Sequence, residues 1–115
     1  MKFKTESYSD CPLCVPVHIL SGKWKINIIG LMMMNEEPWR FADFKRKLGI
    51  TSKVLSTVLK ELEEDGIITR NVIDDTPVKV EYSLTDEGIT MRPFLTEMHK
   101  WGSEYLLNRS ETGNI

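Results

Sequence analysis

The chain has 115 residues, of which 41% are apolar and 28% are charged. This composition predicts one soluble globular domain over residues 1–115 and excludes a multidomain enzyme. The longest apolar run, around residues 26–34, is too short to cross a membrane, and residues 1–10 lack the apolar stretch of a signal peptide. We therefore expect a cytoplasmic protein that makes no membrane contact, with residues 1–10 flexible.

The charges are unevenly distributed, although the net charge is only −2. Residues 40–60 contain six basic side chains and one acidic side chain, Asp43, which gives this stretch a charge of +5 and leaves −7 for the rest of the chain. Local charge decides a local contact with phosphate. A compact positive stretch on an acidic molecule favours binding to a nucleic acid.

Three helices are predicted before residue 50. The first is a short helix over residues 15–20, and the second runs from residue 23 to about residue 34 with apolar side chains nearly all round, which is typical of a buried helix. The third is short and covers residues 41–48. It is followed by Gly49, a residue that commonly ends a helix in the left-handed conformation.

A longer helix is predicted over residues 51–65. Thr51 stands at its start as the N-cap, and Gly66 ends it. Its apolar side chains recur at i, i+3, i+4 and i+7, as expected of one buried helical face. These side chains are Leu55, Val58, Leu59 and Leu62.

The pattern changes to that of a β-hairpin after Gly66. Residues 68–73 are rich in β-forming types, residues 74–77 (Asp-Asp-Thr-Pro) are typical of a turn, and residues 79–84 alternate between apolar and polar. Thr85 then caps a C-terminal helix that we expect to run to about residue 108, with a kink near Pro93. This order predicts a mainly α fold with a small β-hairpin, a winged helix-turn-helix.

One face of the 51–65 helix has the residue types that bind DNA. At about 100° per residue, Lys53, Ser56, Thr57 and Lys60 lie opposite the apolar side chains. Amines and hydroxyls bond phosphates and base edges. We expect Lys53, Ser56 and Thr57 to face bases, and the other candidates to contact phosphates or the flanking minor groove. The full candidate set is Arg40, Lys45, Arg46, Thr51, Ser52, Lys53, Ser56, Thr57, Lys60, Arg70 and Lys79.

A second class of function fits the same fold. A winged helix that no longer binds DNA and contacts a protein through this face would tolerate acidic residues near the hairpin tip, such as Asp74 and Asp75. The +5 segment favours DNA more strongly. Retention on heparin or DNA at increasing salt separates the two, because phosphate contacts are steeply salt-dependent.

The chain also resembles a known family along nearly its whole length. The ordered motifs are Cys11-Pro12, Gly22-Lys23-Trp24, Arg40-Phe41 with Phe44, Gly49-Ile50, the run from Leu59 to Gly66, Pro77, Val80-Glu81-Tyr82-Ser83-Leu84-Thr85, Gly88 and Trp101-Gly102. They resemble HxlR-type transcriptional regulators. The resemblance implies a dimeric bacterial or archaeal transcription factor without enzymatic activity. The chain departs from the pattern at Pro16, at Cys14 and at Asp74-Asp75.

A homodimer is also expected from the apolar surface of the terminal helices. The stripe that begins at Met91 is larger than one small core can cover. Part of it should pair across a two-fold axis with the 15–20 region, so that residues 85–108 form a dimerisation helix. The predicted interface residues are Val15, Ile19, Leu20, Phe94, Met98, Trp101 and Tyr105.

Cys11 and Cys14 are the candidate redox-sensing residues. In the resemblance, Cys11 matches a cysteine through which several HxlR-type regulators sense oxidants or electrophiles. Oxidation would join Cys11 to Cys14 as the resolving thiol, to the partner subunit, or to a small thiol. The pKa of Cys11 would have to be lowered, by a helix N-terminus or by Lys23 or Lys25. The other interpretation is a buried, inert Cys11. Oxidants or small molecules are thus candidate effectors.

Other chemistry is not expected. The Cys-Pro-Leu-Cys spacing occurs in redox enzymes, but no strand precedes it here as in a thioredoxin-like fold. A zinc site of Cys11 and Cys14 would need His18 and His99 as well, so we expect no metal and no cofactor. The run Met32-Met33-Met34 fits core filling better than a ligand cavity.

Overall fold

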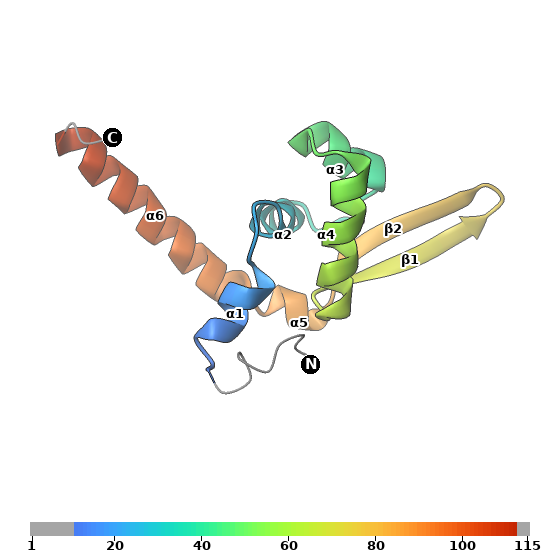
Figure 1. Cartoon of the computed structure of the whole chain (residues 1–115), viewed down its shortest axis with the longest axis horizontal. Coiled ribbons are helices and arrows are strands. Elements are labelled where there is room, and N and C mark those ends of the chain that lie inside the picture. The colour runs from blue at the N-terminus through green and yellow to red at the C-terminus, as the bar shows by residue number, and fades with distance from the viewer. Residues whose placement is uncertain (1–10, 113–115) are drawn as a thin grey trace.

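The computed structural model describes residues 11–112. Within this range the elements are α1 (Cys14–Ile19), α2 (Lys25–Met34), α3 (Phe41–Leu48), α4 (Ser52–Glu64), β1 (Ile68–Asp75), β2 (Val78–Leu84), α5 (Asp86–Ile89) and α6 (Arg92–Thr112). The described chain is elongated, 57 × 36 × 24 Å, because α6 and the β1–β2 hairpin project from opposite sides of a central helical body (Figure 1). The expected flexibility of residues 1–10 concerns residues outside this range.

A tight corner joins α3 to α4, as the sequence predicted. Gly49 has φ +66°, a conformation that residues with a side chain rarely adopt, and its N–H donates to the Lys45 carbonyl at 2.9 Å. Thr51 then caps α4 because its Oγ1 accepts a hydrogen bond from the Val54 N–H at 3.3 Å. At the start of α3, the Asp43 carboxylate accepts from the Arg40 N–H at 2.9 Å, which lowers the pKa of Asp43.

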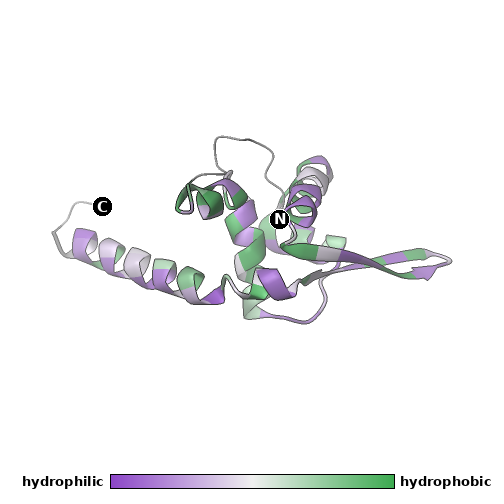
Figure 2. Cartoon of the chain, turned by 90° about the horizontal axis from the view of Figure 1, so that it is seen from below, coloured by the Kyte–Doolittle hydropathy of each residue, from purple (hydrophilic) through white to green (hydrophobic). Residues whose placement is uncertain are grey.

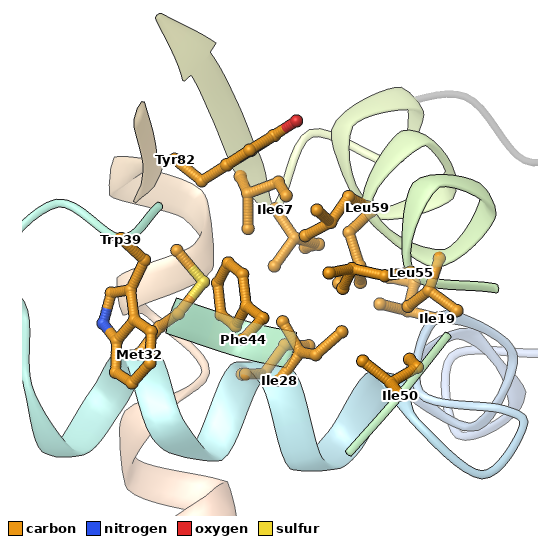
Figure 3. Close-up of a cluster of buried hydrophobic side chains, with 14 of the residues drawn as sticks. Ile19, Ile28, Met32, Trp39, Phe44, Ile50, Leu55, Leu59, Ile67 and Tyr82 are labelled. Atoms are coloured by element: carbon orange, nitrogen blue, oxygen red, sulfur yellow. The ribbon is translucent and has the colours of Figure 1, made fainter. Parts of the chain in front are cut away.

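The core lies where α2, α3, α4 and the base of the hairpin meet (Figure 3). Phe44 is completely buried, with the Trp39 ring stacked on it at 4.9 Å and Tyr82 edge-on at 6.3 Å between centroids. From α4, the four side chains predicted to face the core are all buried: Leu55, Val58, Leu59 and Leu62. Burial of this face fixes which side of α4 is left to solvent.

The hairpin, or wing, is a two-stranded antiparallel sheet. Both strands extend further than predicted: Asp74 pairs with Lys79 and Asp75 pairs with Val78, so the connection is reduced to Thr76-Pro77. The prediction that Asp74 and Asp75 form part of the turn is therefore wrong. The base of the wing is anchored by Trp39 and Tyr82, whose backbone groups exchange hydrogen bonds of 2.9 and 2.8 Å.

The prediction of one kinked helix after Thr85 is also wrong. Thr85 does cap a helix, because its Oγ1 accepts from the Gly88 N–H at 2.9 Å, but α5 ends at Ile89 and α6 begins at Arg92. Pro93 is the second residue of α6, where the missing N–H would have no helical partner. None of the helices within residues 11–112 has both the length and the apolar character required to span a bilayer.

Candidate nucleic-acid interface

The outer face of α4 is polar and open to solvent. Lys53, Ser56, Thr57 and Lys60 are all exposed. Figure 2 shows the corresponding change along the helices between hydrophobic and hydrophilic residues. The Thr57 hydroxyl donates to the Lys53 carbonyl at 3.2 Å, which fixes the orientation of this side chain on the first turns of the helix. The exposed face of α4 thus presents two ammonium groups and two hydroxyls on a rigid element.

The α3–α4 corner brings further predicted residues beside this face. The Lys45 ammonium donates to the Ser52 hydroxyl at 2.8 Å, so a residue of α3 lies at the N-terminus of α4. Arg46 pairs with Asp43 at 3.2 Å and keeps an exposed side chain. Thr51 serves as the helix cap. The Lys45 ammonium thus lies at a helix N-terminus, an environment that favours phosphate.

A hollow of about 560 Å³ separates α4 from the wing. Its polar lining includes Ser56 and Lys60 from α4 and Arg70 from β1, so the structure places Arg70 with the α4 residues. The other predicted wing residue, Lys79, lies apart from them near the tip, where Asp74 is its register partner. The charged residues of the hollow are thus Lys60, Arg70 and Glu63, whereas the wing tip contains two acids.

Acidic partners at this surface were not predicted. Arg40 Nε lies 3.8 Å from the Glu81 carboxylate on β2, and Glu63 lines the hollow with Lys60 and Arg70. At the far end of α4, Glu61 pairs with the nearly buried Lys25 at 3.1 Å. Of these acidic residues, only Glu63 could have been predicted from the sequence. It follows Lys60 by three residues, and residues three apart lie on the same face of a helix.

The terminal helices expose part of the predicted dimer surface. The prediction that Ile19 lies in the dimer interface is wrong. Its side chain is 3% exposed within the core of one subunit and leaves almost no surface for a partner. Val15, Leu20 and Phe94 are half-buried against the same core. On α6, the Trp101 ring is 67% exposed and stacks on Tyr105 at 5.2 Å between centroids. The exposed apolar side chains of α6 are Met98, Trp101, Tyr105, Leu106 and Leu107.

Leu106 and Leu107 were not among the predicted interface residues, and α6 continues past its expected end near residue 108 to Thr112. A second hollow, of about 660 Å³, lies between α2 and α6 and is lined by Met33, Met34 and Met98 among others. Of the three consecutive methionines, Met32 is buried in the core, whereas Met33 and Met34 line this hollow. Arg92 closes one side of this hollow by pairing with Glu36 and donating to the Met33 carbonyl.

The two cysteines are half-buried, reduced and in contact. The Cys14 N–H donates to the Cys11 sulfur at 3.3 Å. The pKa of Cys11 is lowered mainly by the hydrogen bond from the Cys14 thiol and then by that N–H, while the pKa of Cys14 is raised because its thiol donates this bond. The suggestion that Lys23 or Lys25 lowers the pKa of Cys11 is wrong. Lys23 lies 4.8 Å over the Trp24 ring, and Lys25 pairs with Glu61.

Among the residues that the structure describes, no three His, Cys, Asp or Glu side chains come together as a metal site.

Comparison with known proteins gives consistent matches. The profile of the HxlR-like helix-turn-helix family matches residues 19–110. An uncharacterized HTH-type transcriptional regulator of Halalkalibacterium halodurans is 44% identical over 88% of this chain and 89% of its own length. The regulator YdzF of Bacillus subtilis, also uncharacterized, is 42% identical over 81% of this chain and 85% of its own length.

Two solved structures share both the fold and the sequence pattern. The redox regulator HypR in its reduced form superposes with a TM-score of 0.78 at 36% identity, covering 90% of this chain and 99% of that one. The reduced form of the transcriptional regulator YodB from B. subtilis gives a TM-score of 0.73 at 34% identity, covering 83% and 93%. The expected winged helix-turn-helix fold is confirmed by these neighbours, and the relatives' names describe a non-enzymatic role.

Proposed function

Because the chain belongs to the HxlR-like helix-turn-helix family of transcriptional regulators, we propose that it binds DNA sequence-specifically, as a homodimer on a palindromic operator. The observation that carries this proposal is the N-terminal half of α4, which exposes Lys53, Ser56 and Thr57 on a helix fixed to the core by its opposite face. A helix presented in this way fits the major groove.

In the proposed complex, Lys53, Ser56 and Thr57 read base edges. Phosphate contacts come from the basic residues around them: Arg40, Lys45, Arg46 and Lys60. Arg70 contacts the backbone from the hollow between α4 and the wing, which its shared lining with Lys60 supports. Lys79 contacts the flanking backbone or minor groove from the wing.

The salt dependence of DNA binding tests this function. Fluorescence polarisation with a labelled duplex should give a log Kd that rises steeply and linearly with log salt, because each neutralised phosphate releases counterions. Failure to bind any duplex at low salt, with the protein folded, would instead support a protein-interaction module. The acidic wing tip, Asp74 and Asp75, is the observation that favours this second candidate.

The negative charge of the wing tip leads to a separate prediction. If the wing lies along the DNA backbone, the exposed Asp74 and Asp75 repel phosphate. The double change Asp74→Asn, Asp75→Asn should therefore tighten DNA binding roughly twofold to tenfold at low salt, and less at high salt. The matched control is Glu97→Gln, Glu104→Gln on α6, which should leave the affinity unchanged. An equal gain from both pairs would show only an effect of net charge.

The dimer is proposed to form through the exposed apolar face of α6. Trp101→Asp removes a ring that is 67% exposed in the single chain, so folding should be little affected while association is lost. Light scattering at micromolar concentration should give twice the 13.3 kDa chain mass for the parent protein and the single mass for the variant. Ser103→Asp, at an exposed position on the side of α6 roughly opposite Trp101, should remain dimeric. A parent protein of 13.3 kDa would contradict the proposal.

We also propose that Cys11 senses oxidants or electrophiles, which its likeness to redox-regulator structures supports. A lowered pKa means that more thiolate is present at neutral pH, and the advantage over an ordinary thiol disappears above the usual thiol pKa. Cys11 should therefore react faster than Cys14 and faster than a free thiol with iodoacetamide at pH 7. Equal rates, together with Cys11→Ser leaving DNA binding equally insensitive to diamide, would contradict the sensor role.

A further inference from the structure

Cys11 and Cys14 stand at the two ends of one closed turn. The Cys14 N–H donates to the Cys11 carbonyl at 2.9 Å, so residues 11–14 form a four-residue turn that ends at the first residue of α1. The Cα atoms at the ends of such a turn are less than about 7 Å apart. This is the range that a disulfide spans, about 4.4 to 6.8 Å between Cα atoms.

The side chains of the pair also point toward each other. The Cys14 N–H donates to the Cys11 sulfur at 3.3 Å, so the Cys11 side chain is directed back toward Cys14. The Cys14 thiol is also the largest cause of the lowered pKa of Cys11. Both residues are half-buried and neither is part of the core, so a small oxidant has access to them.

We infer that Cys11 and Cys14 of one subunit form a reversible disulfide with each other, so that the dithiol sensor is complete within a single chain. This inference rests on the redox sensing proposed above and specifies its chemistry. The alternative is that Cys11 pairs with a cysteine of the second subunit or with a small thiol. The closed turn favours the partner three residues away.

A hydroperoxide, ROOH, is a two-electron oxidant of the kind that closing this disulfide requires. The Cys11 thiolate attacks the distal oxygen of ROOH and breaks the O–O bond, which gives a sulfenic acid and, after protonation, ROH. The Cys14 sulfur then attacks the Cys11 sulfur, and water leaves with the thiol proton. In sum, two thiols and ROOH give one disulfide, ROH and H₂O, so the thiols lose two electrons and the peroxide gains them.

The hydrogen bonding of the pair sets the order of these steps. Cys11 accepts two hydrogen bonds from Cys14, which stabilises its thiolate and makes it the attacking group. The hydrogen bond to Cys11 and the repulsion of its negative charge raise the pKa of Cys14. Conversion of Cys11 to a neutral sulfenic acid removes that repulsion, and Cys14 becomes the better nucleophile at the moment it is required.

The test is to treat the reduced full-length protein with one equivalent of cumene hydroperoxide and measure its intact mass. The expected result is the loss of two hydrogen masses per chain, a single-chain band on a non-reducing gel, and a peptide map joining residue 11 to residue 14. Dithiothreitol should restore the original mass. In Cys14→Ser, Cys11 should instead be trapped by dimedone as a sulfenic acid, at a rate lower than that at which the parent protein reacts.

Two outcomes would overturn the inference. Covalently linked pairs of chains in the parent protein would place the disulfide between subunits, and an unchanged mass would show that no disulfide forms. DNA binding by the reduced protein is measured in a separate experiment. Failure of this inference therefore leaves the proposed DNA binding intact, and loss of DNA binding in the reduced protein would not affect the mass result.

Discussion

Replacement of Lys53, Ser56 and Thr57 together by alanine should abolish recognition of the operator. Each side chain that pairs well with a base edge contributes about 1–3 kcal/mol of discrimination, so we expect a loss in specific affinity of roughly 100-fold or more. Lys53→Ala alone should cost about 1–3 kcal/mol if Lys53 reads a base, and less if it meets only phosphate. Fluorescence polarisation with operator and scrambled duplexes measures the specific and the nonspecific affinity of each variant.

The triple variant should remain folded. All three side chains are exposed, and alanine is the residue most favourable to a helix. Lys100→Ala on α6 is the matched control for loss of one positive charge and should bind the operator as the parent does. If the triple variant also binds the operator with unchanged affinity, α4 is not the recognition helix.

Gly88→Ala should destabilise the protein strongly. A Cβ at this position would lie 2.3 Å from the Ile67 carbonyl oxygen and 3.3 Å from Leu84 Cδ2. The backbone cannot easily move aside, because Thr85 Oγ1 accepts from the Gly88 N–H and donates to the Gly66 carbonyl at 2.6 Å. We expect the free energy of unfolding to fall by about 2–4 kcal/mol, within the range for overpacked sites.

Urea denaturation followed by circular dichroism measures this effect. Gly30→Ala in α2 is the control, because no heavy atom lies within 4 Å of the Cβ it would add. It should leave the midpoint unchanged or raise it, since alanine favours a helix by up to about 1 kcal/mol over glycine. A Gly88→Ala variant as stable as the parent would mean that α5 does not pack against Ile67 as described.

Local signals explain what the sequence predicted correctly. The caps at Thr51 and Thr85 and the left-handed Gly49 depend on hydrogen bonds within a few residues, so residue type and position were sufficient. The buried face of α4 followed from helical spacing alone. The exposed α4 residues Lys53, Ser56, Thr57 and Lys60 could be predicted for the same reason, because they lie opposite that face.

Contacts between distant segments explain what was missed. Ile19 was assigned to the dimer surface because the spacing of a six-residue helix does not show which side the core will take. The Lys25–Glu61 and Arg40–Glu81 pairs join residues that are far apart in the sequence. The helical or strand spacing of residues along the chain does not predict such pairs. Arg70 and Lys60 line the same hollow only because β1 starts beside α4. The arrangement of the site residues therefore depends on tertiary packing, whereas the positions of the helices follow mainly from local sequence.

Selection of DNA fragments from a random pool by the purified protein, followed by sequencing, tests sequence-specific recognition most directly. The account predicts enrichment of a palindrome whose half-sites lie about one helical turn apart, ~34 Å, because two copies of α4 related by a two-fold axis must enter successive major grooves. The triple alanine variant of α4 should enrich no such sequence. Recovery of unrelated sequences by the parent protein, or of the same palindrome by the variant, would contradict it.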